Sequence, residues 1–275
     1  MKDFTKYYDF ITDEETRLSV RKVADKALLV SKNCSPLSTD FVNQNVIDYS
    51  IPIINNFDIN YKLFPNYEHS ERKSLILYPS FEDNVDESEF ITALRINNRS
   101  KFKELDHSNY LGSLMSLGIE RSKIGDIYVH DNYADVICHA DLADTIIYNL
   151  EQIGRNKIEI EKIDIGNVSF KEPDFVLLTI NVSSMRLDNV VKALINKSRD
   201  IGTDLIKAGD VKVNFIPEEK ASLLLEKGDL ISVRRYGRFL IYNENGNTKS
   251  GKIRLEIKYY TNVNSKNWNY ADSKS

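Results

Sequence analysis

The sequence lacks most features of secreted and membrane-spanning proteins. Its 275 residues hold only two cysteines, Cys34 and Cys138, and these fall in different predicted domains. We therefore expect reduced thiols and no structural disulfide. No apolar run approaches the roughly 18 residues of a membrane helix, and the first residues lack the apolar core of a signal peptide. These absences predict a cytoplasmic protein with no membrane span.

Loops typical of enzymes are also missing. The sequence contains no Gly-rich phosphate loop, no G-x-G-x-x-G turn, no nucleophile elbow and no His-Glu-x-x-His motif. His130, Cys138 and His139 do not predict a zinc site, because adjacent strand residues face opposite sides and a fourth ligand is lacking. We predict no catalytic residues, no metal and no cofactor.

The charge of the chain is unevenly distributed. The net charge is −4, yet residues 183–275 carry 17 Lys and Arg against 11 Asp and Glu, while residues 1–182 carry 20 against 30. A basic C-terminal part on an acidic body indicates that one end of the molecule binds polyanions. A solvated basic surface is the alternative, and charge alone does not decide between them.

The first 55 residues have the pattern of a helical segment. Asp13 precedes apolar residues at helical spacing over residues 18–30, and Thr39-Asp40 precedes a second such pattern over residues 41–47. Ser35-Pro36 separates the two helices. The functional residues of this segment, if it has any, cannot be identified from the sequence.

Residues 56–182 predict a ferredoxin-like domain in an α+β protein. The expected order is strand 89–96, helix 107–117, strand 126–130, strand 133–139, helix 141–153 and strand 158–164. This order places two helices on one face of an antiparallel sheet, as in RNA-recognition motifs. The strand at Tyr133 lacks the glycine and paired aromatic residues of those motifs, so RNA binding by this sheet has little support. A further strand is expected over residues 175–182, leading into Ser183.

Residues 183–262 contain two helices followed by strands. Apolar residues at Leu187, Val190, Val191, Leu194 and Ile195 predict a helix with one buried face. Its expected cap is one of the two preceding serines, 183 or 184.

A second helix follows immediately. Its expected cap is Ser198, and its expected stop is Gly209. Val211, Lys212 and Val213 then alternate as in a half-buried strand. Strands are also expected over residues 238–242 and 253–259, and residues 263–275 are expected to form a flexible tail.

About sixty of these residues, 183–242, resemble the S-four RNA-binding domain of translation proteins. The resemblance rests on Arg186-Leu187-Asp188, Ser198-Arg199, Leu205-Ile206, Gly209, Val211, Val213-Asn214 and Gly228-Asp229-Leu230-Ile231-Ser232-Val233. Phe215 stands where the domain usually has glycine, which predicts that the hairpin after Val213 is opened or re-routed.

The candidate RNA-binding residues gather in this C-terminal module. Guanidinium groups bind phosphate through two hydrogen bonds and stack on bases, whereas lysines add point charges and a helix N-terminus offers free N–H groups. The predicted set is Arg186, Lys197, Ser198, Arg199, Lys207, Lys212, Arg234, Arg235 and Arg238. Arg121 and Lys123, in a loop between two glycines, are candidates for a second RNA contact.

Most of the chain is similar to the YlmH family, whose members join a ferredoxin-like domain to a C-terminal S-four domain. The likeness is carried by residues 109–114 (Asn-Tyr-Leu-Gly-Ser-Leu) and residues 117–127, followed by the S-four pattern. It implies a non-enzymatic factor that binds rRNA of the large ribosomal subunit and tRNA during ribosome-associated quality control of stalled nascent chains. We expect a monomer when the protein is not bound to the ribosome. Two alternatives stay open: an RNA-modifying enzyme with an unrecognised site in residues 70–182, and a scaffold linked to cell division.

Overall fold

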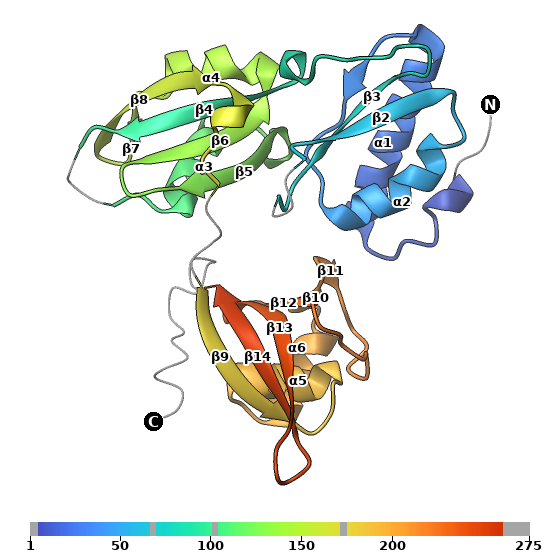
Figure 1. Ribbon diagram of the computed structural model, residues 1–275, viewed down its shortest axis with the longest axis vertical. Helices are drawn as coiled ribbons and strands as arrows, with labels where there is room; N and C mark the ends of the chain where they lie inside the picture. The colour runs from blue at the N-terminus through green and yellow to red at the C-terminus, as the bar shows by residue number, and fades with distance from the viewer. Residues whose placement is uncertain (1–4, 67–69, 101–103, 171–174, 261–275) are drawn as a thin grey trace. The chain divides into compact units, whose positions relative to one another are not determined.

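The computed structural model describes residues 5–66, 70–100, 104–170 and 175–260. The chain forms two compact units, residues 1–172 and residues 173–275, and Figure 1 labels their elements. Each unit combines helices with an antiparallel sheet, which confirms the predicted α+β class. The expected tail, residues 263–275, lies outside the described residues.

The N-terminal part of the first unit contains two helices and a small sheet. A 3-10 turn, η1 (Thr5–Tyr7), precedes α1 (Glu14–Asn33) and α2 (Gln44–Ile54). The Asp13 carboxylate accepts a hydrogen bond from the Thr16 amide at 2.9 Å, so α1 begins where its cap predicts. The sheet consists of β1 (Leu37–Ser38), β3 (Ser74–Pro79) and β2 (Ile59–Phe64), in that order.

This small sheet corrects the predicted boundary at residue 55. The strands β2 and β3 pair with each other, and the side chains of Ile59, Leu75 and Leu77 join the core formed by α1 and α2. The strands β2 and β3 therefore pack with the N-terminal helices, because apolar side chains of both strands are buried there rather than in the ferredoxin-like core. The N-terminal segment is a mixed helix-and-sheet layer and not a purely helical one.

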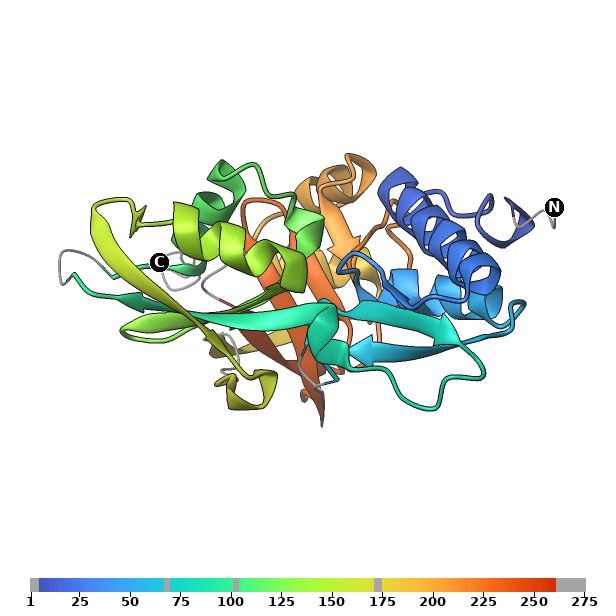
Figure 2. The same ribbon diagram turned by 90° about the horizontal axis from the view of Figure 1, so that it is seen from above.

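The rest of the first unit has the predicted ferredoxin-like arrangement. Its elements are η2 (Glu87–Glu89), β4 (Ile91–Asn98), α3 (His107–Ser116), η3 (Arg121–Lys123), β5 (Ile124–Val129), β6 (Tyr133–His139), η4 (Ala140–Leu142), α4 (Ala143–Asn149), β7 (Gln152–Ile153), β8 (Asn156–Ile163) and η5 (Ile165–Asn167). The sheet order is β5-β6-β4-β8-β7. Tyr110 and Leu114 of α3 and Ile146 of α4 are buried against one face of this sheet. Figure 2 shows α1 and α4 on the same side of the two sheets.

Phe41 joins the two parts of the first unit. Its side chain is 1% exposed, and its amide donates to the carbonyl of Ser122 at 2.8 Å. The ring lies directly against Gly125 of β5, where an added Cβ would be 2.8 Å from the nearest ring carbon. Gly125 is thus required by a close approach between the two parts.

Replacing Gly125 with alanine is expected to lower the free energy of unfolding of the first unit by about 1–3 kcal/mol, because the methyl group overpacks the Phe41 contact. Urea denaturation measures the change. The matched control is Gly112→Ala on α3, where nothing lies within 4 Å of the added Cβ. That control should raise stability by about 0.5–1 kcal/mol through helix propensity. Equal midpoints for Gly125→Ala and the unaltered chain would contradict the tight contact.

The second unit is a six-stranded sheet with two helices on one face. Its elements are β9 (Phe175–Val182), α5 (Leu187–Ile195), α6 (Arg199–Lys207), β10 (Val211–Val213), β11 (Ile216–Pro217), β12 (Leu230–Val233), β13 (Gly237–Asn247) and β14 (Ile253–Tyr260). The sheet order is β11-β10-β12-β13-β14-β9. Figure 1 shows β9, β14 and β13 in front of α5 and α6. The apolar residues predicted for the first helix are all buried in the core between helices and sheet.

The strand β9 corrects the predicted boundary between residues 182 and 183. It pairs with β14 along its whole length, from Phe175 opposite Tyr260 to Val182 opposite Ile253. The side chains of Leu178, Ile180 and Val182 are buried in the core of the second unit. The strand therefore belongs to the C-terminal sheet, because its backbone hydrogen bonds and its apolar face are satisfied there.

The hairpin at Phe215 also differs from its prediction. Val213 pairs with Ile216, so Asn214 and Phe215 form a tight two-residue turn with φ values of 50° and 72°, and the hairpin is not opened. Phe215 accepts the left-handed conformation because the Asn214 side chain pins the turn to β12, accepting from the Leu230 amide at 2.9 Å.

The start of α5 has no side-chain cap. The residue at the cap position is Arg186, and the amides of Leu187 and Asp188 donate to the carbonyls of Leu223 and Ala221 at 2.9 and 3.0 Å. A neighbouring backbone segment therefore satisfies the first N–H groups, which is why neither predicted serine is needed. The predicted caps of α6 are confirmed: Ser198 accepts from the Ile201 amide at 3.4 Å, and Gly209 has φ 72°.

Candidate nucleic-acid interface

Helix α6 presents cationic side chains to solvent at both ends. Lys197 precedes the capping residue Ser198, Arg199 is the first helical residue and Lys207 is the last, and all four are exposed. Ile206 of the same helix is fully buried, so the buried face fixes which side of α6 faces outward. The result is an exposed N-terminus with free N–H groups and positive side chains, which suits a phosphate group.

A buried carboxylate holds two of the predicted arginines. Asp188 in α5 is 3% exposed. Its Oδ2 accepts a hydrogen bond from Nη2 of Arg186 at 2.8 Å and from Nη2 of Arg199 at 2.6 Å. The side chains of these arginines remain 38% and 51% exposed. One acidic residue therefore links the ends of two helices and leaves parts of both guanidinium groups facing solvent.

The hydrogen bonds from Arg186, assisted by those from Arg199, lower the pKa of Asp188 to about 2 despite its burial. The carboxylate is thus charged at neutral pH, and the two guanidinium groups are held in defined positions. Donors fixed in advance lose less conformational entropy when they bind a phosphate. We name the residues Arg186, Asp188, Lys197, Arg199 and Lys207 the helical basic surface.

The remaining predicted residues lie elsewhere in the second unit. Lys212 of β10 and Arg238 of β13 share the sheet face that points away from α5 and α6, because each pairs with Ser232 of β12. Arg234 and Arg235 occupy the turn between β12 and β13, and Nη1 of Arg234 is 3.1 Å from Oδ1 of Asp210. The single predicted set is therefore divided among the helices, the open sheet face and one turn.

Arg121 and Lys123 have partners within the first unit. The Arg121 guanidinium donates to the carbonyl oxygens of Ile124 and Gly125, and Nζ of Lys123 is 2.8 Å from Oδ1 of Asp40. The Lys123 pair links the loop after α3 to the N-terminal layer, whereas the Arg121 bonds stay within the loop and the start of β5. Both side chains are thus held by partners within the first unit, and their second RNA contact stays a prediction.

The open face of the ferredoxin-like sheet is acidic and partly covered. Asp135 is fully buried there, bound by both Nε and Nη2 of Arg95 at 2.8 Å, and Glu161 lies opposite Arg95 on β8. The ring centre of Tyr133 is 4.5 Å from the ring centre of His130, which stacks on it, and 4.5 Å from Cζ of the Arg95 guanidinium. On the same face the Phe170 ring, 43% exposed, packs edge to face on Tyr128 at 5.1 Å.

Comparisons with known proteins match both units. Residues 86–167 match the family model described as the putative RNA-binding domain in YlmH, and residues 185–231 match the S4 domain. The chain is 31% identical over 250 residues to ribosome-associated protein quality control protein P2 of Bacillus subtilis strain 168, covering 90% of this chain and 96% of that protein. This chain belongs to the YlmH family. The resemblance inferred from the sequence is confirmed.

A solved structure is also similar to this YlmH-family chain. Cell division protein ylmH from Streptococcus pneumoniae matches with 21% sequence identity and a TM-score of 0.47. The match covers 57% of this chain and 96% of that one.

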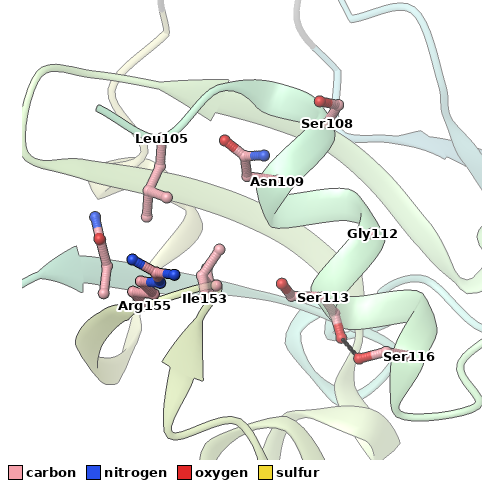
Figure 3. A pocket seen from close by; sticks show the side chains of 10 residues that line it. Leu105, Ser108, Asn109, Gly112, Ser113, Ser116, Ile153 and Arg155 are labelled. Carbon is pink, nitrogen blue, oxygen red and sulfur yellow. Dashed lines mark hydrogen bonds between the residues drawn. The ribbon is translucent and has the colours of Figure 1, made fainter. Parts of the chain in front are cut away.

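A groove lies within the part that matches the YlmH RNA-binding domain. It has a volume of about 780 Å³ and is lined by α3 on one side and by the turn from β7 to β8 on the other (Figure 3). The side chain of Asn109 binds the helix start at Asp106, and the Ser116 hydroxyl donates to the carbonyl of Ser113. Arg155 supplies the positive charge at its edge. The Ser108 hydroxyl also donates to the Asp106 carboxylate at 2.6 Å, so several polar groups of the groove bond to the start and end of α3.

The described residues of this YlmH-family chain contain no group of three His, Cys, Asp or Glu side chains that could hold a metal ion. Within the same residues, no helix has both the length and the apolar character needed to cross a membrane.

Sequence reasoning missed the role of Asp188. The carboxylate stands two residues after Arg186 and eleven before Arg199, a spacing that gives no sign of a shared contact until the two helices are placed side by side. Gly202 lies at the contact between these helices, where an added Cβ would be 3.4 Å from the Lys192 amide nitrogen and 3.6 Å from the carbonyl oxygen of Asp188.

Proposed function

We propose that this protein is a non-enzymatic, cytoplasmic RNA-binding factor that attaches to the large ribosomal subunit through the helical basic surface, contacting folded rRNA and tRNA. The observation that carries the proposal is the location of exposed Arg199 and Lys207 on α6 and of exposed Lys197 just before its capping residue, within a domain that matches the S-four model. Folded RNA presents phosphates in fixed positions, which suits cations held on a rigid helix.

The role in ribosome-associated quality control is supported by the Bacillus subtilis relative, whose name places it in that process. Coverage of 90% of this chain and 96% of the relative includes both units, so the likeness is not limited to one module. A protein acting on stalled nascent chains must distinguish an obstructed large subunit. Contacts to both rRNA and tRNA would supply that distinction, because only the obstructed subunit still holds a peptidyl-tRNA.

Centrifugation of cell extracts tests this function. We expect the protein to sediment with large-subunit fractions at low salt and to leave them as salt rises, because phosphate contacts weaken with ionic strength. Crosslinking followed by sequencing of the attached RNA should recover large-subunit rRNA and tRNA. Absence from the large-subunit fractions at low salt would refute the proposal. Changed nucleotide modifications in rRNA or tRNA of a deletion strain would instead favour an enzyme.

A further inference from the structure

The open face of the C-terminal sheet carries aromatic and cationic side chains in register. This face lies opposite α5 and α6, and Figure 1 shows its strands β9, β14 and β13 side by side. One continuous cross-strand row, in which each residue pairs with the next, consists of Lys212, Ser232, Arg238, Tyr260 and Phe175. We name this surface the open sheet face.

Large side chains on this face are exposed rather than packed. Phe175 is 39% exposed, Leu177 is 51% exposed and Tyr242 is 47% exposed. Their neighbours along β9, Leu178 and Ile180, point into the core and are buried. Strand residues on a solvent face are normally polar, so exposed aromatic side chains in such positions mark an interaction surface.

Positive charges stand among these rings. The Lys258 ammonium is 4.4 Å from the ring centre of Phe175 and 4.7 Å from that of Tyr242. The Arg238 guanidinium is 5.7 Å from the ring centre of Phe215. Each cation is thereby held beside an aromatic surface.

The charge of the open sheet face is positive. The described residues at its outward strand positions include Lys212, Arg238, Arg254 and Lys258, against Glu256. The open face of the ferredoxin-like sheet has the opposite character, with Glu159 and Glu161 on β8 and Asp135 buried beneath Arg95. Two antiparallel sheets in one chain thus present opposite charges.

We propose that the open sheet face binds a single-stranded RNA segment, whose bases stack on Phe175 and Tyr242 while Lys212 contacts its phosphates. The inference rests on the proposed RNA-binding function and adds a second surface to the helical one. Bases in a duplex already stack on each other, whereas unpaired bases expose the flat surfaces that aromatic side chains accept. The positive charge favours a polyanion over an apolar protein segment.

The test uses the full-length chain and two labelled probes, an oligouridine of about 10 nucleotides and a folded tRNA. The variant Phe175→Leu with Tyr242→Leu removes two stacking surfaces and keeps apolar side chains at both positions. Its affinity for oligouridine should fall about tenfold or more. Thr179→Ala, an exposed change on the same face, is the matched control and should bind as the unaltered protein does.

The variant Lys197→Ala with Lys207→Ala separates the two surfaces. It should lose affinity for tRNA and keep its affinity for oligouridine, while the aromatic variant should do the reverse. Failure of the unaltered protein to bind oligouridine, or equal binding by the aromatic variant, would overturn the inference without touching the proposed function. If each double variant lost affinity equally for tRNA and for oligouridine, the inference would also be overturned, because both probes would then bind one common surface.

A second variant guards against misfolding. Lys212→Ala changes an exposed side chain of β10 and leaves every ring in place. It should weaken oligouridine binding and reduce the salt dependence of that binding by about one phosphate contact. Circular dichroism melting establishes whether each variant is folded. A folded Lys212→Ala protein with unchanged oligouridine affinity and salt dependence would count against the surface.

Discussion

Replacing Lys197 and Lys207 together with alanine is expected to weaken binding of folded ribosomal RNA about 30-fold at about 0.15 M salt. Both lysines are exposed, one before the start of α6 and one at its end. If each neutralises one phosphate, the slope of log affinity against log salt should fall by about two, and extrapolation to this ionic strength gives the stated factor. Affinity measured by filter binding across a salt series provides both quantities.

The control for this prediction removes the same charge from another place. Lys249 and Lys252 are exposed residues of the connection between β13 and β14 in the same unit. Their double replacement with alanine should leave the slope nearly unchanged, because no specific phosphate contact is lost. An equal loss in both double variants would mean that net charge, and not the helical basic surface, determines the affinity.

Replacing Asp188 with asparagine is expected to lower the free energy of unfolding of the second unit by about 2 kcal/mol at neutral pH. The carboxylate is 3% exposed and its pKa is lowered to about 2, chiefly by hydrogen bonds from Arg186 and also by those from Arg199. Asparagine keeps the size of the side chain and removes the charge that both guanidinium groups bind. The arginines are partly solvated, so the loss should stay below that of a fully buried ion pair.

The pH dependence identifies the source of this stability. A carboxylate whose pKa is lowered in the folded state stabilises the protein above its unfolded pKa of about 4 and loses that contribution as the pH falls toward 2. The difference in free energy of unfolding between Asp188→Asn and the unaltered chain, measured by urea denaturation, should therefore become smaller as the pH falls from about 4 toward 2. Asp210→Asn is the control, because its partner Arg234 is 71% exposed and the pair should contribute little. If the difference in free energy of unfolding stayed constant with pH, the charge of the Asp188 carboxylate would not be the source of this stability.

The order of elements in both units could be predicted because their apolar spacing is regular. Leu187, Val190, Val191, Leu194 and Ile195 repeat at the period of a helix and are all buried. The strands and helices of residues 91–163 follow the predicted order, and the sheet has the ferredoxin-like arrangement. Local patterns are sufficient here because each element has one buried face.

The domain boundaries could not be predicted, because they depend on which strands pair. Residues 175–182 alternate between buried and exposed positions as any half-buried strand does, and only the register with β14 assigns them to the second unit. Residues 59–79 pose the same difficulty in the first unit. Pairing partners far apart in sequence leave no mark in the local pattern.

The candidate site was predicted in part for a related reason. Charge and helix position identified Lys197, Arg199 and Lys207, which the structure places at the two ends of α6. The same reasoning grouped Lys212 and Arg238 with them, although strand alternation puts these two on the far face of the sheet. It also named Arg121 as a candidate RNA contact without its bond to the Gly125 carbonyl, which is visible only when the chain is folded.

The pairing of β9 with β14 has a consequence for the synthesis of this protein. The two strands are separated by about seventy residues, and contacts between distant segments form late because a long loop must be closed first. While β14 is still being synthesised, β9 has no partner and its backbone N–H and C=O groups face solvent. The second unit therefore cannot complete its sheet until residue 260 has left the ribosome, the same particle on which we propose the folded protein acts.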